Sequence, residues 1–247
     1  MPYEYDPKAY MTRLLQTVAA RNKEPKEDRF KAEAGTTATP KIPLVASQGL
    51  AYILKDDGTY EVSGIGTCQD TNLVIPNEYD GKPVTSIGNQ AFDECNSLTT
   101  LIIGENVMNI GDHAFRDCKS LTTVTFSDSV VNIGDSTFSG CSSLTSVALP
   151  DSMKSIGDYA FYACSSLTSV IIGGGMKYIG NGAFWLCSNL TSVAIGGSVT
   201  IIGYVAFYSC SSLTDIYYAG TQAEWNAITK YGDWDFDTPY YIVHFNC

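Results

Sequence analysis

The chain has few of the residues on which catalysis and metal binding most often depend. Its 247 residues include two histidines, His113 and His244, and charged side chains make up 17%. Eight cysteines are present, but the sequence has no Cys-x-x-Cys pair and no run of 18 or more apolar residues. These absences argue against a zinc site, a nucleophile with a histidine base and a membrane-spanning helix. We therefore expect no metal, no cofactor and no enzymatic activity.

Basic residues are scarce after the first 48 positions. Residues 1–48 carry eight Lys or Arg and six Asp or Glu, so the rest of the chain carries seven against twenty, a net charge of −13. Nucleic-acid binding relies on clustered Lys and Arg, so an acidic chain of this kind is not expected to bind it. The simplest role of the negative charge is solubility.

The main feature of the sequence is a repeated 23-residue unit. The pattern Ile-Gly-x-x-(Ala/Thr)-Phe-x-x-Cys-x-(Ser/Asn)-Leu-Thr begins six times without an insertion, at residues 87, 110, 133, 156, 179 and 202. A unit this short cannot bury its own apolar side, so neighbouring units must stack into a solenoid. The Ile, Phe, Cys and Leu positions should each form one column along the core.

Two different periods alternate within each unit. The Ile, Ala, Phe and Cys positions lie near one face of a short helical turn. The residue two after each Ile is a plausible N-cap of this turn: Asn89, Asp112, Asp135, Asp158 and Asn181. The following stretch, such as Leu121 to Phe126, alternates with β-branched residues and predicts a short strand.

These motifs resemble the BspA-like class of leucine-rich repeats. The resemblance covers about residues 49–245. It implies an α/β fold, a right-handed leucine-rich-repeat solenoid with one short strand plus one helical turn per 23-residue repeat, a parallel strand ladder and a cap at both ends. It also implies binding of proteins or cell surfaces, and it brings no catalytic role.

The chain divides into four expected parts. Residues 1–48 form an amphipathic and linker segment, and residues 49–86 an N-terminal cap with a hairpin across Asp57-Gly58 and a degenerate repeat. Residues 87–216 form the six-repeat array, and residues 217–247 the C-terminal cap.

The N-terminal segment departs from the family pattern. Helical spacing of Tyr10, Met11, Leu14, Leu15 and Val18 predicts an amphipathic helix from about Pro7 to Arg21. Charged residues interrupt the stretch where a secretory leader would have its apolar core, so we recognise no secretory signal. The location stays open between the cytoplasm, a virion or other assembly, and a cell surface reached by another route. The segment either docks the chain into a homo-oligomer or larger assembly, or packs on the neighbouring cap, or is a disordered leader.

The six repeated cysteines are expected to be structural. Their positions should stack at about the spacing of adjacent strands, roughly 5 Å. Side chains in one column point the same way, so disulfides between neighbours would distort the ladder, and buried reduced thiols are favoured. Cys68 and Cys247 lie outside the column, and their state stays open.

Two surfaces are candidates for ligand binding. The strand face carries small, mostly uncharged residues with few anchors: Thr123, Thr125, Ser146, Ser169, Ser192, Asp215 and Tyr217. The helical-turn side becomes aromatic in the last three repeats: Tyr159, Tyr162, Tyr178, Trp185, Tyr204 and Tyr208. Exposed aromatic clusters are frequent in protein contacts. The alternative is that these rings only pack on one another and shield neighbouring repeats.

Two functions remain open. The first is a non-enzymatic binding or adhesion protein that recognises a protein or glycan on a cell surface through a face of the solenoid. The second is a structural component of a virion, a phage tail or another assembly, docked through residues 1–48 with the repeats projecting as a receptor-binding element.

Overall fold

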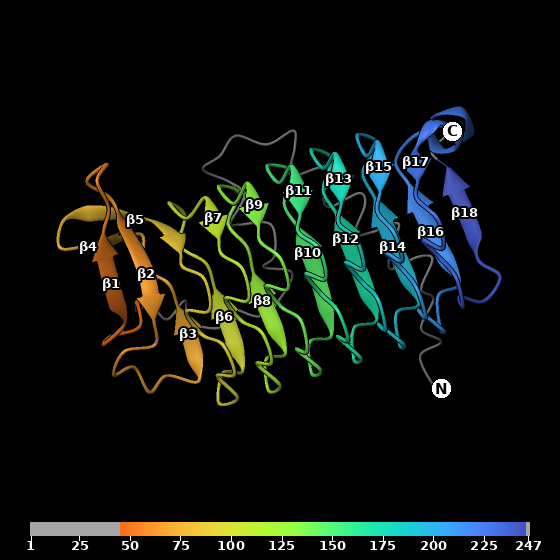
Figure 1. Cartoon of the computed structure of the whole chain (residues 1–247). Helices are drawn as coiled ribbons and strands as arrows, with labels where there is room; N and C mark the ends of the chain where they lie inside the picture. The colour runs from red at the N-terminus through yellow and green to blue at the C-terminus, as the bar shows by residue number, and fades with distance from the viewer. Residues whose placement is uncertain (1–44, 246–247) are drawn as a thin grey trace, which may run out of the picture. The chain divides into compact units, whose positions relative to one another are not determined.

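The computed structural model describes residues 45–245. The amphipathic helix expected at Pro7–Arg21 and the thiol of Cys247 lie outside the described residues. In residues 45–245, the chain folds as a solenoid of parallel strands that repeats every 23 residues (Figure 1).

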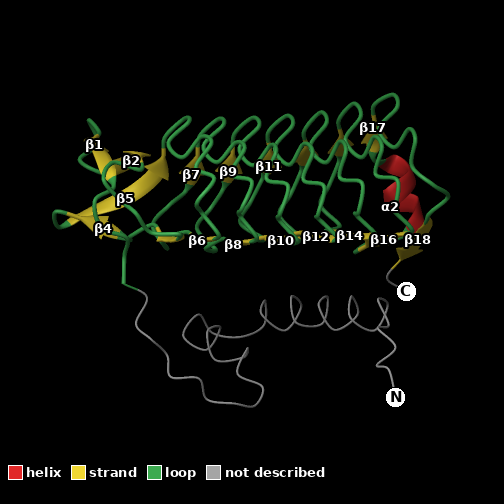
Figure 2. Cartoon of the chain, turned by 90° about the horizontal axis from the view of Figure 1, so that it is seen from below, coloured by secondary structure: helices red, strands yellow, loops and turns green. Residues whose placement is uncertain are grey.

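Each full repeat contributes two strands to the solenoid. The longer strands line one side, and the short two-residue strands lie in a second ladder away from them (Figure 2). The longer strands of the repeats and of the far cap are β3 (Asn72–Val74), β6 (Thr100–Ile102), β8 (Thr123–Thr125), β10 (Ser146–Leu149), β12 (Ser169–Ile172), β14 (Ser192–Ile195), β16 (Asp215–Tyr218) and β18 (Ile242–Phe245). The short strands are β7 (Asn109–Ile110), β9 (Asn132–Ile133), β11 (Ser155–Ile156), β13 (Tyr178–Ile179), β15 (Ile201–Ile202) and β17 (Thr229–Lys230).

The ladders keep a strict one-repeat register. Ser146 pairs with Ser169 and Ser169 with Ser192, so equivalent residues stand side by side. Strands β10, β12, β14, β16 and β18 form one sheet and β3, β6 and β8 another, so the long-strand ladder is interrupted between β8 and β10. The interruption coincides with Phe126, which follows β8 where the other full repeats have Ile or Leu, or Tyr218 in the last, and whose ring packs edge-on against Phe138 at 5.8 Å.

The predicted helical turn is wrong, although the predicted parallel ladder is confirmed. The segments after the short strands are successive turns, and the one helix among the described residues is α2 (Gln222–Ala227) in the C-terminal cap. Two positions of every turn segment adopt positive φ, for example Tyr159 (56°) and Ala163 (57°). Left-handed residues cannot continue an α-helix, so the backbone instead bonds to the next repeat: Phe161 N–H donates to the Ala183 carbonyl.

The predicted N-cap role of the Asx column is also wrong. The Oδ1 atom of each residue accepts from the backbone N–H one repeat further on, as from Asp135 N–H to Asp112 at 2.8 Å. The same bond recurs at Asn89, Asp135, Asp158 and Asn181. These side chains tie adjacent repeats together, because the turn has no helical N-terminus for them to cap.

The core consists of aligned columns, as the repeat predicts. Six phenylalanine rings, one per repeat from Phe92 to Phe207, are fully buried and stacked with centroids 5.0–5.4 Å apart. The ring of Trp234 in the far cap meets Phe207 edge-on and ends the column. Offset ring stacking adds about 0.5–1.5 kcal/mol per pair to the gain from burial.

The cysteine column confirms the prediction of reduced thiols. All seven described cysteines are free, and the five from Cys118 to Cys210 are fully buried. Each of these five donates its Sγ hydrogen to the Phe carbonyl of the preceding repeat at 3.2 Å, as Cys141 does to Phe115. Burial raises the pKa of these five thiols, that of Cys210 to about 12.

The glycine that follows each repeat isoleucine allows the turns to approach closely. A Cβ on Gly157 would collide with the backbone of Gly134 one repeat earlier, and a Cβ on Gly180 would collide with Gly157. The obstacle is backbone in both cases, so it cannot rotate away.

Different structures close the two ends of the repeat array. Strands β1 (Ala51–Leu54) and β2 (Tyr60–Gly64) form the predicted antiparallel hairpin, which joins the short-strand sheet through β5 (Lys82–Ile87), while β4 (Glu78–Tyr79) pairs with β5. At the other end, Thr221 and Glu224 form a reciprocal capping box that starts α2. No helix among residues 45–245 is long and apolar enough to cross a membrane.

Candidate binding surface

One surface of the solenoid is built from the turn segments that follow the short strands. We call it the turn face. Its polar half comprises residues 89–96, 112–119 and 135–142, and its aromatic half comprises residues 158–165, 181–188, 204–211 and 231–239. The last segment belongs to the far cap, yet it continues the ladder, because Phe207 N–H donates to the Trp234 carbonyl and Ser209 N–H to the Phe236 carbonyl.

A row of four aromatic rings runs across the aromatic half. Tyr162, Trp185, Tyr208 and Phe236 occupy one column, with successive centroids 5.4, 5.6 and 5.4 Å apart. The first three are half-buried, whereas Phe236 is 57% exposed. Trp185 meets both tyrosines edge-to-face, and its Nε1 is buried without a hydrogen-bond acceptor among the described residues. The row is therefore partly a packed structure and partly an open surface.

More rings lie beside this row. Tyr159 is 39% exposed and leans over Gly182 towards Trp185, at a centroid distance of 6.1 Å. Tyr204 and Tyr231, 55% and 41% exposed, stack on each other at 5.1 Å. Sequence reasoning missed Tyr231 and Phe236, because the far cap lacks the Ile-Gly and Cys positions that align the other repeats.

Tyr178 lies at the margin of the aromatic half and has a local partner. Its hydroxyl is 3.4 Å from Asp158 Oδ1. Burial first, and the nearby Asp158 carboxylate second, raise the pKa of the Tyr178 hydroxyl. Tyr178 is half-buried, so it contributes less open ring surface than Tyr204.

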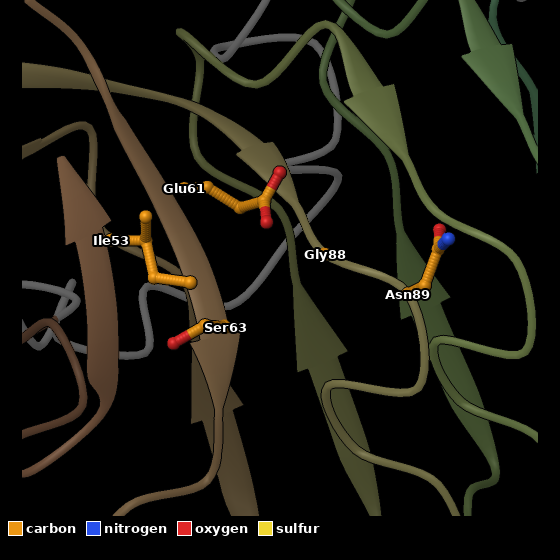
Figure 3. A pocket seen from close by; sticks show the side chains of 5 residues that line it. All are labelled: Ile53, Glu61, Ser63, Gly88 and Asn89. Atoms are coloured by element: carbon orange, nitrogen blue, oxygen red, sulfur yellow. The ribbon is translucent and has the colours of Figure 1, made fainter. Parts of the chain in front are cut away.

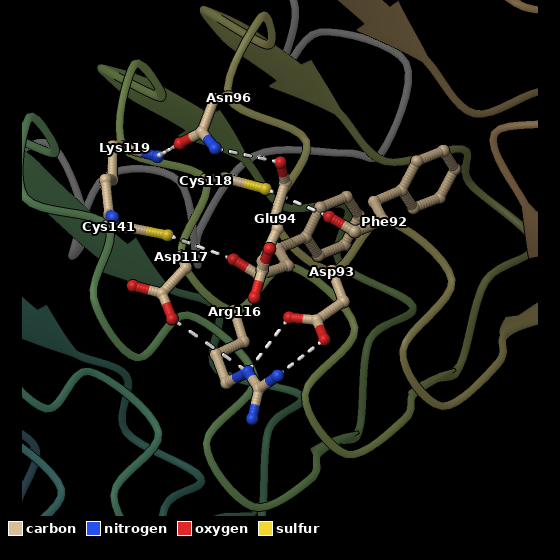
Figure 4. A network of polar contacts seen from close by, with 10 residues as sticks. Phe92, Asp93, Glu94, Asn96, Arg116, Asp117, Cys118, Lys119 and Cys141 are labelled. Atoms are coloured by element: carbon tan, nitrogen blue, oxygen red, sulfur yellow. Dashed lines mark hydrogen bonds and ion pairs between the residues drawn. The ribbon is translucent and has the colours of Figure 1, made fainter.

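The polar half carries an ion pair where the aromatic half has rings. Arg116 occupies the column of Tyr162, and its Nε and Nη2 donate to the two carboxylate oxygens of Asp93 at 2.9 and 2.7 Å (Figure 4). Asp117 approaches the same guanidinium at 4.0 Å. The hydrogen bond to Asp93 is the main cause that raises the pKa of Arg116.

The strand face is more closed at its C-terminal end than the sequence predicts. Thr123, Thr125 and Ser146 are exposed, and Ser169 and Asp215 are half-buried. Ser192 and Tyr217 are buried, which corrects the expectation that they face outward. At Tyr217 the reason is strand β18, which extends the sheet past β16: His244 stacks on the Tyr217 ring at 4.5 Å and bonds Asp215 at 2.6 Å.

An open depression lies on the N-terminal cap. It has a volume of about 350 Å³ and is lined by Ile53, Glu61, Ser63, Gly88 and Asn89 (Figure 3). The Glu61 carboxylate accepts a hydrogen bond from Ser86 at its edge. Neither histidine lines it, and no group of three His, Cys, Asp or Glu within residues 45–245 is placed to hold a metal ion.

The fold defines a parallel solenoid of leucine-rich repeats with no catalytic constellation in its described surfaces. The BspA type leucine rich repeat region matches residues 85–214 in six copies. The chain belongs to this family, which confirms the resemblance seen in the repeats. No catalytic family is indicated, and no curated protein matches the chain.

Solved structures of bacterial proteins have the same architecture. A leucine rich repeat protein of T. pallidum is 29% identical, with a TM-score of 0.65 over 70% of this chain and 80% of that one. A leucine-rich repeat protein of Bacteroides ovatus is 33% identical, with a TM-score of 0.59 over 70% of this chain and 46% of its own length. The pneumococcal vaccine antigen PcpA, at 16% identity and a TM-score of 0.60, shares the fold alone.

Proposed function

We propose that this chain is a non-enzymatic binding protein that recognises a protein partner at a cell surface through the aromatic half of its turn face. One observation carries the proposal: Tyr159, Tyr204, Tyr231 and Phe236 are exposed rings on three of the four turn segments of the aromatic half, and the half-buried Trp185 of the remaining segment packs against Tyr159. Monomeric proteins rarely expose contiguous aromatic surface without a partner for it. Tyrosine rings also lose little conformational entropy when they are buried in an interface.

The strand face supports binding less well. Its exposed residues are small and uncharged in the middle repeats, and its bulkiest member, Tyr217, is already buried. Contacts made by such residues contribute little to affinity compared with buried aromatic anchors. The strand face is therefore the matched control for the turn face.

Two double variants separate these surfaces. The purified chain would be screened against arrays of surface proteins and glycans, and each bound molecule retested with Tyr204→Ser/Phe236→Ser and with Thr123→Ala/Ser146→Ala. We expect the ring variant to lose at least about tenfold in affinity, since one aromatic anchor contributes about 1–2 kcal/mol. The strand-face variant should bind like the parent chain. Loss of binding in the strand-face variant alone would contradict the proposal.

Folding of both variants must be checked independently. The strand ladder provides the readout, because its far-ultraviolet circular dichroism signal comes from the backbone and does not depend on the side chains of Tyr204 or Phe236. A ring variant with native spectrum and unchanged urea midpoint but no partner binding would support the contact role. A ring variant that unfolds would be replaced by Tyr231→Ser, whose ring is exposed and packs on Tyr204 alone among the described aromatic rings.

A further inference from the structure

The charge of the aromatic half points to the kind of partner it takes. We propose that this surface binds a protein segment that carries lysine or arginine side chains over its rings. The inference rests on the proposed function and names the chemistry of its partner.

The two halves of the turn face differ in charge as well as in ring content. The aromatic half contains four charged residues, all acidic: Asp158, Asp233, Asp235 and Asp237. It contains no Lys, Arg or His. The polar half also has carboxylates, but it includes His113, Arg116 and Lys119, and Arg116 neutralises Asp93 directly.

Asp158, Asp233 and Asp237 of the aromatic half keep their negative charge uncompensated, whereas Asp235 lies near enough to the Lys230 ammonium to oppose the lowering of the Lys230 pKa by burial. Asp237 accepts from the Ser209 hydroxyl at 2.9 Å, and Asp235 from the Tyr241 hydroxyl at 2.6 Å. Neutral donors such as these hold a carboxylate in place without cancelling its charge. Among the described residues, none of the four forms an ion pair with a basic side chain. Asp233 and Asp237, which flank the exposed Phe236 in the sequence, are also exposed.

One basic side chain of the far cap already binds an aromatic ring in this way. Lys230 donates to the Trp225 carbonyl at 2.6 Å, and its Nζ lies 4.4 Å from the Trp225 ring centroid. A cation over an aromatic ring gains about 0.5–1 kcal/mol at exposed sites and more when it is desolvated. Because Lys230 is committed to Trp225, it leaves the open faces of Tyr204 and Tyr231 to a cation from outside the chain.

Other ligand charges fit the surface less well. An anionic partner would bring like charges together at Asp233 and Asp237, which is costly at an interface. A neutral glycan could stack on the rings but would leave the carboxylates uncompensated. A basic segment satisfies both features, and the net negative charge of the array would speed its approach.

The test uses the full chain and three defined probes. The first is a short peptide of alternating arginine or lysine and leucine, the second replaces every basic residue by glutamate, and the third is a neutral oligosaccharide of β-1,4-linked glucose. Binding is followed by isothermal titration calorimetry. We expect the basic peptide alone to bind, with affinity falling several-fold as salt rises from about 0.02 M to about 0.5 M. Equal or tighter binding of the acidic peptide or the sugar, or no binding of the basic peptide, would overturn the inference.

Two variants and one control locate the bound cation. Tyr204→Ser/Tyr231→Ser should weaken the basic peptide about tenfold, because two open ring faces are removed. Asp233→Asn/Asp237→Asn should weaken it about threefold at low salt. The control Asp112→Asn/Asp135→Asn removes the same charge from the polar half and should change affinity less than about twofold. Equal weakening by the control would mean that the peptide follows net charge alone, which would also overturn the inference.

The failure of this inference is distinguishable from failure of the proposed function. A partner found on the arrays that is neutral or acidic, and is still lost in Tyr204→Ser/Phe236→Ser, would leave the turn face as the binding surface and exclude a basic ligand. A partner that binds this variant at full affinity would remove the proposed function itself.

Discussion

The polar and aromatic halves of the turn face stand on the same backbone and the same core. His113 in one half and Tyr159 in the other both have a φ of 56°, and the Phe rings beneath them stack at 5.0–5.4 Å throughout. Only the outward columns differ, with Arg116 and Asp93 on one side and Trp185 and Tyr208 on the other. Architecture and surface chemistry are thus specified by separate positions of one repeat. The surface can change along the array without disturbing the ladder.

Alkaline pH should produce the largest effect, because it acts on the core of both halves. The raised pKa of the five buried thiols, from an ordinary value of 9.0, means that the unfolded chain loses these protons first as pH rises. Between the unfolded and folded pKa values the folded chain binds more protons, so its stability falls with rising pH. Each thiol contributes up to about 1.4 kcal/mol per pH unit in this window.

We expect a urea midpoint that is steady below about pH 8 and falls steeply above about pH 9. Cys118→Ala in the polar half and Cys187→Ala in the aromatic half should each make the alkaline slope shallower by the same amount. A midpoint that does not change up to pH 10.5 or so would contradict linkage through the thiols. Unequal slopes for the two variants would show that the halves do not share one core.

Truncating one core ring in each half should cost about 3–5 kcal/mol of stability. Phe115 and Phe184 each lie between two stacked neighbours and are fully buried, so Phe115→Ala and Phe184→Ala should be equally destabilising. Urea unfolding followed by circular dichroism measures both. The exposed Tyr204→Ser serves as the control and should cost less than about 1 kcal/mol. A clear difference in stability between the two Phe variants would show that the two halves do not have the same core packing.

The columns of the core could be predicted from the sequence, but the turn conformation could not. A residue type repeated at a fixed phase must meet its equivalents, and the Ile, Phe and Leu columns are indeed buried in every repeat. The turn needs left-handed backbone at two positions, and glycine at both positions of every repeat would have predicted it. Glycine fills these positions only at Gly140 and Gly182, and the other repeats have residues such as Gln90, His113 and Leu186, which give no such signal. The periodicity alone therefore suggested a helix.

The candidate site was predicted in part. The aligned repeats show the change from a polar to an aromatic residue between Ser139 and Tyr162. The sequence therefore identified the rings of the last three repeats. The sequence did not predict Phe236, because residues Asp233 to Asp237 do not match the repeat pattern around Tyr208. Backbone hydrogen bonds, not a shared motif, align this stretch with the turn of Tyr208. The burial of Ser192 and Tyr217 also depends on tertiary neighbours, which a repeat pattern does not encode.

The contacts of the two halves should respond differently to salt. A double-mutant cycle on Asp93 and Arg116 should give a small favourable coupling energy, and one on Tyr208 and Phe236 about 0.5–1.5 kcal/mol. Unfolding measured at about 0.5 M salt should reduce the first coupling and leave the second unchanged, because only the ion pair is screened. A ring coupling that falls with salt would show that the two columns are not chemically distinct.

The smallest effect is expected at Val205, where the two halves differ in strain. Val205 has a φ of 48°, and a β-branched residue is unfavourable in this left-handed region. The same column holds Ser136 in the polar half, at 53°, and Gly182 in the aromatic half, at 58°. Asparagine tolerates this backbone, so Val205→Asn should raise stability by about 0.5 kcal/mol, and the matched Ser136→Asn should leave it unchanged within about 0.3 kcal/mol.

Partner binding decides what the strain at Val205 means. If the side chain belongs to the contact surface, Val205→Asn should stabilise the chain and weaken the basic peptide, since an apolar side chain beside Tyr204 and Tyr208 is replaced by a polar one. Stabilisation with unchanged binding would instead place Val205 outside the contact. Destabilisation would mean that the packing of the half-buried Val205 side chain stabilises the chain by more than the backbone strain costs. Val205 would then be a packing residue of the aromatic half and not part of its contact surface.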